Sequence, residues 1–260
     1  MPRIQPLNQE VDWPREEGAI GVVGVAPWAT LDFLRALYDL VPATKDWHYP
    51  RVLADINTKL PSRGRHLELG ERNPAPYIRE TIEELAAQGA DCAVVPCNTA
   101  HILFDQWSSG TSIPVLSIVD SVLDELVGTQ GPVAVLASAS IARFGLYERA
   151  LEARGMAFMG LSQAQQSVVN QAIAEVKVDG RASVSCMERV ESMLDEFAAR
   201  EAGGIVLGCT ELAGLLAACK ARVPVAVESN AALARRALQF VGLPPGGAGC
   251  GSMPSGTIEE

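Results

Sequence analysis

The sequence predicts an α/β fold made of two similar halves, each a parallel sheet flanked by helices. Two observations support this prediction. Short apolar runs rich in β-branched residues alternate with longer amphipathic stretches, which is typical of strand–helix–strand units. The same order of segments then occurs a second time along the chain, which predicts two pseudo-symmetric domains that face each other across a cleft.

In the first half, strands and helices are expected to alternate from residue 19 onward. The expected strands are residues 19–25 (AIGVVGV), 49–56 (YPRVLADI) and 91–97 (DCAVVPC), and the expected helices are residues 30–40 and 77–89. Segments with the apolar spacing of a strand alternate here with segments that have the apolar spacing of a helix. This alternation favours a parallel sheet whose strands are joined by helices.

The second half contains matching segments in the same order. GPVAVLAS begins at Gly131 as GAIGVVGV begins at Gly18, and these glycines are 113 residues apart. Cys97 and Cys209, which follow later strands of the two halves, are 112 residues apart. The repeat is therefore almost in register, and a final helix at 230–240 is expected to cross back to the first half.

These segments predict the following division of the chain. The first domain comprises residues 18–122 with 228–243, and the second comprises residues 123–227. Residues 1–17 are polar and interrupted by proline, and form an N-terminal extension. Residues 244–260 are rich in Gly, Pro and Ser, and form a flexible tail.

Charge and composition exclude several classes of partner. The formal net charge of −10 opposes binding to nucleic-acid phosphates and to anionic lipid surfaces, so neither partner is expected. No apolar run is long enough to span a membrane, and the N-terminus lacks the apolar core of a secretory signal, which predicts a cytoplasmic protein. The six cysteines form no CxxC pair, and no metal site is expected.

Cys97 and Cys209 occupy corresponding positions in the two halves. Each follows a short apolar strand and precedes a small polar residue and a helical stretch. Each sulfur is therefore predicted at the carboxyl end of a strand and near a helix N-terminus, where free N–H groups stabilise a thiolate. The same N–H groups, together with Asn98, Thr99 and Thr210, suit a substrate carboxylate.

Two thiols on opposite sides of one carbon can invert a stereocentre without a cofactor. One thiolate removes a proton from one face while the other thiol delivers a proton to the opposite face. Donors to the substrate carboxylate stabilise the enediolate that develops. The pattern therefore predicts a racemase or epimerase in which Cys97 and Cys209 are the acid and base. The other cysteines, which have no counterpart in the repeat, are expected to be inert: Cys92, Cys186, Cys219 and Cys250.

Two segments resemble the catalytic signatures of the aspartate/glutamate racemase superfamily, whose enzymes work without pyridoxal phosphate. These are PCNTAH (residues 96–101) and GCTEL (residues 208–212), and the Glu after Cys-Thr is more similar to the aspartate racemase branch. The resemblance covers roughly residues 18–240. It implies an active site between two α/β domains, no cofactor, a homodimer, and racemisation of aspartate, glutamate or a modified relative.

The resemblance also assigns roles to single residues. It supports Cys97 and Cys209 as the acid/base pair and the three neighbouring polar residues as carboxylate ligands. Thr30, in APWAT, corresponds to a Thr of the family's first loop, and Arg63, in LPSRG, resembles an Arg near the distal carboxylate of the substrate. Ser138, in LASAS, is also expected to contact the substrate.

The sequence departs from the family pattern around the distal end of the substrate. GVAPWAT lacks two glycines of the family loop, and Ser62 stands where the family has Asp. Lys177 lies one position from the expected substrate-facing Lys, an offset that rotates a helical side chain by about 100°. These changes concern substrate specificity more than the chemistry at the α-carbon.

Two histidines near these segments allow alternative interpretations. His101 lies one turn after Cys97 and either tunes the thiolate or is a satisfied structural histidine. His66 lies in the charge-rich RGRHLELGER, which is predicted to be an exposed loop or a mobile lid.

Other functions are compatible with the same fold. A decarboxylase, a cis-trans isomerase of an unsaturated diacid and a hydantoin-type racemase use cysteines in similar places, and retention of both cysteines argues against the one-thiol decarboxylases. A catalytically silent protein that binds a small acid in the cleft is the alternative from another functional class.

Overall fold

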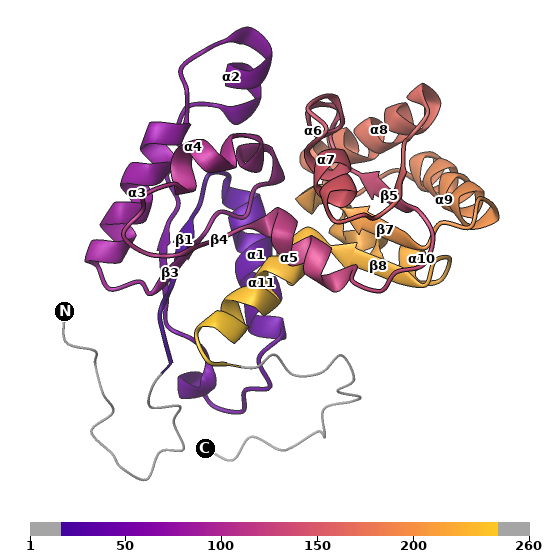
Figure 1. The fold of residues 1–260 in the computed structure, drawn as a ribbon. Coiled ribbons are helices and arrows are strands. Elements are labelled where there is room, and N and C mark those ends of the chain that lie inside the picture. Colours follow the sequence, from indigo (N-terminus) through magenta and orange to yellow (C-terminus); the bar gives the residue numbers. More distant parts are fainter. Residues whose placement is uncertain (1–16, 244–260) are drawn as a thin grey trace.

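The structure is a computed structural model that describes residues 17–243 of the 260-residue chain. It contains two four-stranded sheets in which every strand pair is parallel, and helices flank both sheets (Figure 1). The α/β fold with two similar halves is confirmed. Residues 1–16 of the predicted N-terminal extension and all of the predicted tail, with Cys250, lie outside the described residues.

The two sheets have the same strand order. The first sheet has the order β2-β1-β3-β4, with strands β1 (Ile20–Val23), β2 (Val52–Asp55), β3 (Cys92–Val94) and β4 (Val115–Leu116). The second has the order β6-β5-β7-β8, with strands β5 (Val133–Leu136), β6 (Phe158–Met159), β7 (Gly204–Leu207) and β8 (Val225–Glu228). The central strands β1 and β5 are buried throughout, which explains why both read as continuous apolar runs.

Helices connect the strands in both halves. Those within the first half are α1 (Pro27–Asp39), η1 (Asp46–His48), α2 (Arg63–Leu69), α3 (Ala75–Ala87), η2 (Asn98–Leu103) and α4 (Phe104–Ser108). Those that follow β4 are α5 (Ile118–Glu125), α6 (Ala139–Arg143), α7 (Leu146–Ala153), α8 (Gln163–Asp179), α9 (Val184–Ala199), η3 (Thr210–Leu215), α10 (Leu216–Lys220) and α11 (Ser229–Phe240).

The two halves are joined by α5 and α11. Helix α11 leaves β8 of the second sheet and packs against α1 and α5, as the sequence predicted for its last helix (Figure 1). Helix α5 covers residues 118–125 and so crosses the predicted domain boundary between residues 122 and 123. One apolar core includes Ile20 of the first sheet, Val206 of the second and Leu233 of α11, so a single core extends through both halves.

Most of the charge-rich RGRHLELGER segment, residues 63–69, is a short helix and not a loop. The Ser62 hydroxyl accepts a hydrogen bond from the Arg65 N–H (3.3 Å) at the start of α2, and Gly70 ends the helix with a φ of 66°. A serine N-cap and a left-handed glycine C-cap are favourable helix boundaries, and here they override the polar character of the segment. The prediction of a loop was therefore wrong.

Within residues 17–243, no helix has both the length and the apolar character that a membrane span requires. In the same range, no group of three or more His, Cys, Asp or Glu side chains is arranged to hold a metal ion.

Candidate active site

A cavity of about 320 Å³ lies between the two halves and receives residues from both. The first half contributes Cys97 with the segment around it and Arg63 from the start of α2. The second half contributes Cys209 with its neighbours, and Lys177 from α8. Both sulfur-bearing residues are half-buried, so neither is sealed inside its own half.

The two cysteines have matching local structures. β3 ends at Val94 and Cys97 is the N-cap of η2, while β7 ends at Leu207 and Cys209 is the N-cap of η3. Both cysteines have extended backbone conformations, which turn the chain from a strand into a 3₁₀ turn. Both therefore lie at the carboxyl edge of a parallel sheet, where such sheets bind ligands.

Cys209 is held as a thiol by a neighbouring carboxylate. Its Sγ donates to Oε2 of Glu211 (2.9 Å), which also accepts from the Thr210 hydroxyl (3.1 Å). Lys177 Nζ lies 3.4 Å from the other Glu211 oxygen. Burial and the Glu211 charge raise the pKa of Cys209, so the expected lowering at a helix N-terminus does not occur for this thiol.

Glu211 itself is ionised within this network. Burial opposes its charge, but hydrogen bonds from Cys209 and Thr210 and the ammonium group of Lys177 hold its pKa below the ordinary value. The one-residue offset of Lys177 does not remove it from the site, since its side chain lines the cavity.

Asn98 is oriented by two partners from distant parts of the chain. Its Oδ1 accepts from the Tyr147 hydroxyl (2.6 Å), and its Nδ2 donates to Oγ of Ser229 (3.0 Å). Burial raises the pKa of Tyr147, so its hydroxyl stays a donor. The Tyr147 ring packs beside Gly208, where an added Cβ would lie 3.1 Å from the ring.

His101 is a structural histidine. Its Nδ1 lies 2.9 Å from the Cys97 carbonyl, and its Nε2 accepts from the Ile118 N–H (3.1 Å). Burial lowers the pKa of His101 to about 4, so the ring is neutral near pH 7 and donates from Nδ1. The ring therefore links the backbone of the first signature to the start of α5.

The other predicted substrate residues divide into two groups. Thr99, Thr210, Ser138 and Arg63 line the cavity. Arg63 is fixed there by donating to the carbonyls of Pro61 (3.2 Å) and Val25 (2.8 Å), which leaves part of its guanidinium for a ligand. Thr30 does not line the cavity: it is fully buried, and its hydroxyl donates to the Ala26 carbonyl (2.7 Å).

Sequence reasoning did not identify Tyr147 and Ser229 as site residues. They lie 49 and 131 positions from Asn98, and no local spacing indicates contacts of that range. Of the remaining cysteines, Cys92, Cys186 and Cys219 are free and buried away from the cavity.

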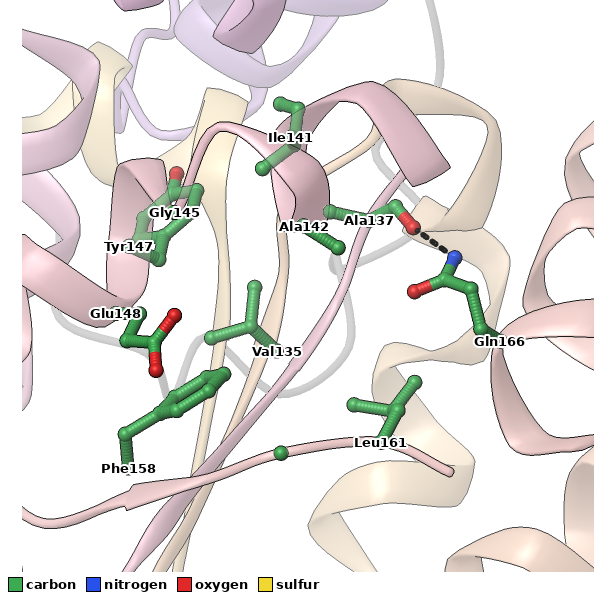
Figure 2. Close-up of a pocket in the computed structure, with 11 residues that line it drawn as sticks. Val135, Ala137, Ile141, Ala142, Gly145, Tyr147, Glu148, Phe158, Leu161 and Gln166 are labelled. Atoms are coloured by element: carbon green, nitrogen blue, oxygen red, sulfur yellow. Dashed lines mark hydrogen bonds between the residues drawn. The ribbon is translucent and has the colours of Figure 1, made fainter. Parts of the chain in front are cut away.

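A second, smaller cavity of about 190 Å³ lies within the second half (Figure 2). Its lining is largely apolar, and Gln166 closes one side by donating from Nε2 to the Ala137 carbonyl (2.9 Å). Neither Cys97 nor Cys209 lines it. The Tyr147 ring contributes to its wall, while the Tyr147 hydroxyl donates to Asn98, which lines the cysteine cavity.

Comparison with known proteins assigns the family. The sequence pattern of the family described as Asp/Glu/hydantoin racemase matches residues 20–237, which include both cysteine signatures. The chain belongs to this family. The matched region extends from β1 into α11 and so includes both sheets of this chain.

Individual members of the family resemble the chain over most of its length. The broad specificity amino-acid racemase RacX of Bacillus subtilis (strain 168) is 26% identical over 224 residues, which cover 83% of this chain and 95% of RacX. A solved structure of Picrophilus torridus aspartate racemase is 23% identical with a TM-score of 0.76, covering 88% of this chain and 96% of that chain.

An aspartate racemase homologue from Pyrococcus horikoshii OT3 is 21% identical with a TM-score of 0.73, covering 86% of this chain and 99% of that chain. These similarities to solved structures establish the racemase fold for the chain.

Proposed function

We propose that the protein is a cofactor-independent amino-acid racemase that uses Cys97 and Cys209 as paired acid and base. The observation that carries this proposal is that the two cysteines come from opposite halves and line one cavity. A substrate α-carbon between them would have a sulfur on each face, which is the arrangement that inversion requires.

The surroundings of the two thiols suggest their starting states. Cys209 donates its hydrogen bond to Glu211 and so enters the reaction as the thiol, which leaves Cys97 to act as the base on the opposite face. Cys97 takes the α-proton, and the electron pair of the C–H bond moves into the substrate carboxylate. The Cys209 thiol then delivers its proton to the opposite face as the pair returns to the carbon.

Polar groups near the cysteines are suited to hold the substrate carboxylate. The Thr99 and Thr210 hydroxyls line the cavity, and Asn98 has a second amide N–H beyond the one given to Ser229. Donors fixed in advance stabilise the enediolate without reorganisation during the reaction. Tyr147 and Ser229 contribute by fixing the orientation of the Asn98 amide.

We further propose an acidic amino acid, aspartate, glutamate or a modified relative, as a substrate. Arg63 supports this choice, because its guanidinium lines the cavity and is partly free to pair with a distal carboxylate. The printed name of RacX indicates that a relative accepts several amino acids. The homodimer and the cytoplasmic location expected from the sequence stay predictions.

Incubation with single enantiomers in deuterated water tests the proposal. With the wild-type enzyme, the amino acid is expected to exchange its α-hydrogen for deuterium, and the solution is expected to lose its optical rotation. Cys97→Ala and Cys209→Ala are each expected to reduce racemisation by about 10³-fold or more, because each removes one of two obligatory proton carriers. Cys219→Ala, which changes a buried cysteine outside the cavity, is the control. Binding of acids without exchange in the wild type would instead favour a silent binding protein.

A further inference from the structure

The smaller cavity, of about 190 Å³, takes no part in the proposed reaction. It lies among β5, β6, α6, α7 and the start of α8 (Figure 2). Its inner wall consists of four buried residues: Val135, Ala137, Ile141 and Tyr147. Ala142, Glu148 and Gly160 line its outer part and are exposed. The cavity therefore opens to solvent, and a small molecule can enter it.

One carboxylate stands in an otherwise apolar lining. The Glu148 carboxylate is directed toward Phe158 and Val135 (Figure 2), and within residues 17–243 it has no ion-pair or hydrogen-bond partner. Gln166 and Tyr147, which also line the cavity, already donate hydrogen bonds to other residues. An apolar hollow with one unpaired carboxylate at its mouth suits a small apolar molecule that carries an ammonium group.

A single layer of side chains separates this cavity from the Cys209 turn. Gly208 precedes Cys209 and lines the cysteine cavity. A Cβ added at this glycine would lie 3.1 Å from the Tyr147 ring, 3.2 Å from Ala137 and 3.6 Å from Val135. All three of these residues line the smaller cavity on their other side. A ligand there would therefore press on the residues that support the Cys209 turn.

Tyr147 also connects the smaller cavity to the Cys97 turn. Its hydroxyl donates to Asn98 (2.6 Å), which lines the cysteine cavity. Side-chain atoms that border an empty space lack packing contacts on that side. A ligand that fills the space would hold the Tyr147 ring in place, and with it the orientation of the Asn98 amide.

We infer that the smaller cavity is an effector site for a small apolar ammonium compound, and that its occupation strengthens substrate binding in the cysteine cavity. Tyr147 is the residue that couples the two cavities. The effect on a substrate rests on the proposed function, whereas the binding of the ammonium compound does not. The coupling is reciprocal, so the substrate would strengthen binding of the effector by the same factor.

The ligands 2-phenylethylammonium and 2-phenylethanol provide a matched test of the site, because they have nearly the same size and only the first is charged. In calorimetric titration, 2-phenylethylammonium is expected to bind with a dissociation constant of about 1 mM, about fivefold more tightly than the alcohol. Glu148→Gln should remove this preference. Glu152→Gln, which makes the same charge change at an exposed position of α7 outside the cavity, should keep it.

Filling the cavity tests its position. Ala142→Leu places a larger side chain in the lining and should weaken binding of both ligands about tenfold. Ala153→Leu, at an exposed position of α7 outside the cavity, should leave both affinities unchanged. Absence of 2-phenylethylammonium binding to the wild type would overturn the site, as would binding that Glu148→Gln and Ala142→Leu leave unchanged.

Titration with racemic aspartate, whose composition racemisation does not change, measures the coupling. Saturating 2-phenylethylammonium is expected to lower the dissociation constant of aspartate about fivefold. Tyr147→Phe keeps the ring in the wall but loses the bond to Asn98, so it should still bind 2-phenylethylammonium while the coupling falls to about twofold or less.

The outcomes separate this inference from the proposed function. An aspartate affinity that stays the same or falls in the presence of 2-phenylethylammonium would overturn the coupling, and undiminished coupling in Tyr147→Phe would overturn the role of Tyr147. If aspartate and 2-phenylethylammonium bind with the expected coupling but no amino acid exchanges its α-hydrogen, the proposed function fails and the effector site is supported.

Discussion

Glu211 makes the two thiols that line the shared cavity different from each other. The repeat places Cys97 and Cys209 in matching turns, but Glu211 accepts a hydrogen bond from Cys209. The residue that corresponds to Glu211 in PCNTAH is Thr99, whose side chain carries no charge. A single carboxylate therefore distinguishes two otherwise similar thiols by holding the proton on Cys209.

Glu211→Gln should move the pH dependence of racemisation. The Glu211 charge raises the pKa of Cys209, so its removal lowers that pKa. Turnover needs one proton on the pair, and the higher pKa of the pair sets the pH above which this proton is lost. The basic limb of the kcat/KM profile is therefore expected at lower pH in the variant. Glu188→Gln, on the exposed side of α9, should leave the profile unchanged, and an unmoved basic limb in Glu211→Gln would contradict the assignment.

His101 should make the stability of the protein depend on pH. Its folded pKa of about 4 lies below the ordinary value of 6.5, so the unfolded chain binds the proton more tightly and stability falls as the pH drops from 6.5 toward 4. Between pH 7 and pH 5, His101 should reduce the free energy of unfolding by about 2 kcal/mol.

Denaturant unfolding at the two pH values checks this effect. His101→Gln should lose less stability than the wild type over the interval, whereas His48→Gln, at a partly exposed site, should behave like the wild type. Equal pH dependence in wild type and His101→Gln would contradict a neutral buried ring.

Among the helices, α2 connects the cysteine cavity to the opposite half of the molecule. It begins at Arg63, which lines the cysteine cavity, and Glu68 on the same helix accepts a hydrogen bond from the Ser140 hydroxyl of α6 (2.5 Å). A seven-residue helix is too short to be stable alone, so its caps contribute much of its order.

Ser62→Ala should weaken α2 and displace Arg63. Loss of this N-cap is expected to cost about 1 kcal/mol and to raise the KM for an acidic substrate about fivefold. Ser62→Thr, which keeps a capping hydroxyl, should retain the wild-type KM. Ser183→Ala removes the equivalent cap of α9, where the Ser183 hydroxyl accepts from the Cys186 N–H (3.3 Å). This control should lose similar stability in thermal unfolding while its KM stays unchanged, and an equal rise in KM would refute the role of α2.

At the scale of the whole molecule, the shared core makes the two halves depend on each other. Side chains from both sheets meet α5 and α11 in one buried cluster, and Arg235 of α11 forms two hydrogen bonds to Glu125 of α5 (2.6 and 2.7 Å). Neither sheet can lose α11 without exposing part of this cluster to water.

The two halves should therefore unfold in one transition. Trp28, Trp47 and Trp107 belong to the first half, so tryptophan fluorescence reports mainly on that half, whereas far-UV circular dichroism reports on both. Coincident denaturation curves are expected.

Leu233→Ala should shift both curves together and lower the free energy of unfolding by about 3 kcal/mol, because Leu233 is fully buried in the shared core. Leu69→Ala, at a residue that is 63% exposed, is the control. Separate transitions would contradict a shared core.

The alternation of strands and helices, the repeat, and the positions of Cys97 and Cys209 at matching strand ends could all be predicted from the sequence. These features depend on local periodicity and on spacing along the chain, which a single sequence displays directly. It did not predict α2, because favourable caps at Ser62 and Gly70 outweighed the polar composition of that segment.

Which side chains meet, and how deeply each is buried, depends on the packing of elements that are distant in sequence. Packing brought Tyr147 and Ser229 to Asn98 and held the proton on Cys209. Packing also buries Thr30 outside the cysteine cavity, where the sequence had predicted it to contact the substrate. Contacts between distant residues, and the pKa changes that burial causes, arise from the packing of separate elements, which local sequence patterns do not specify.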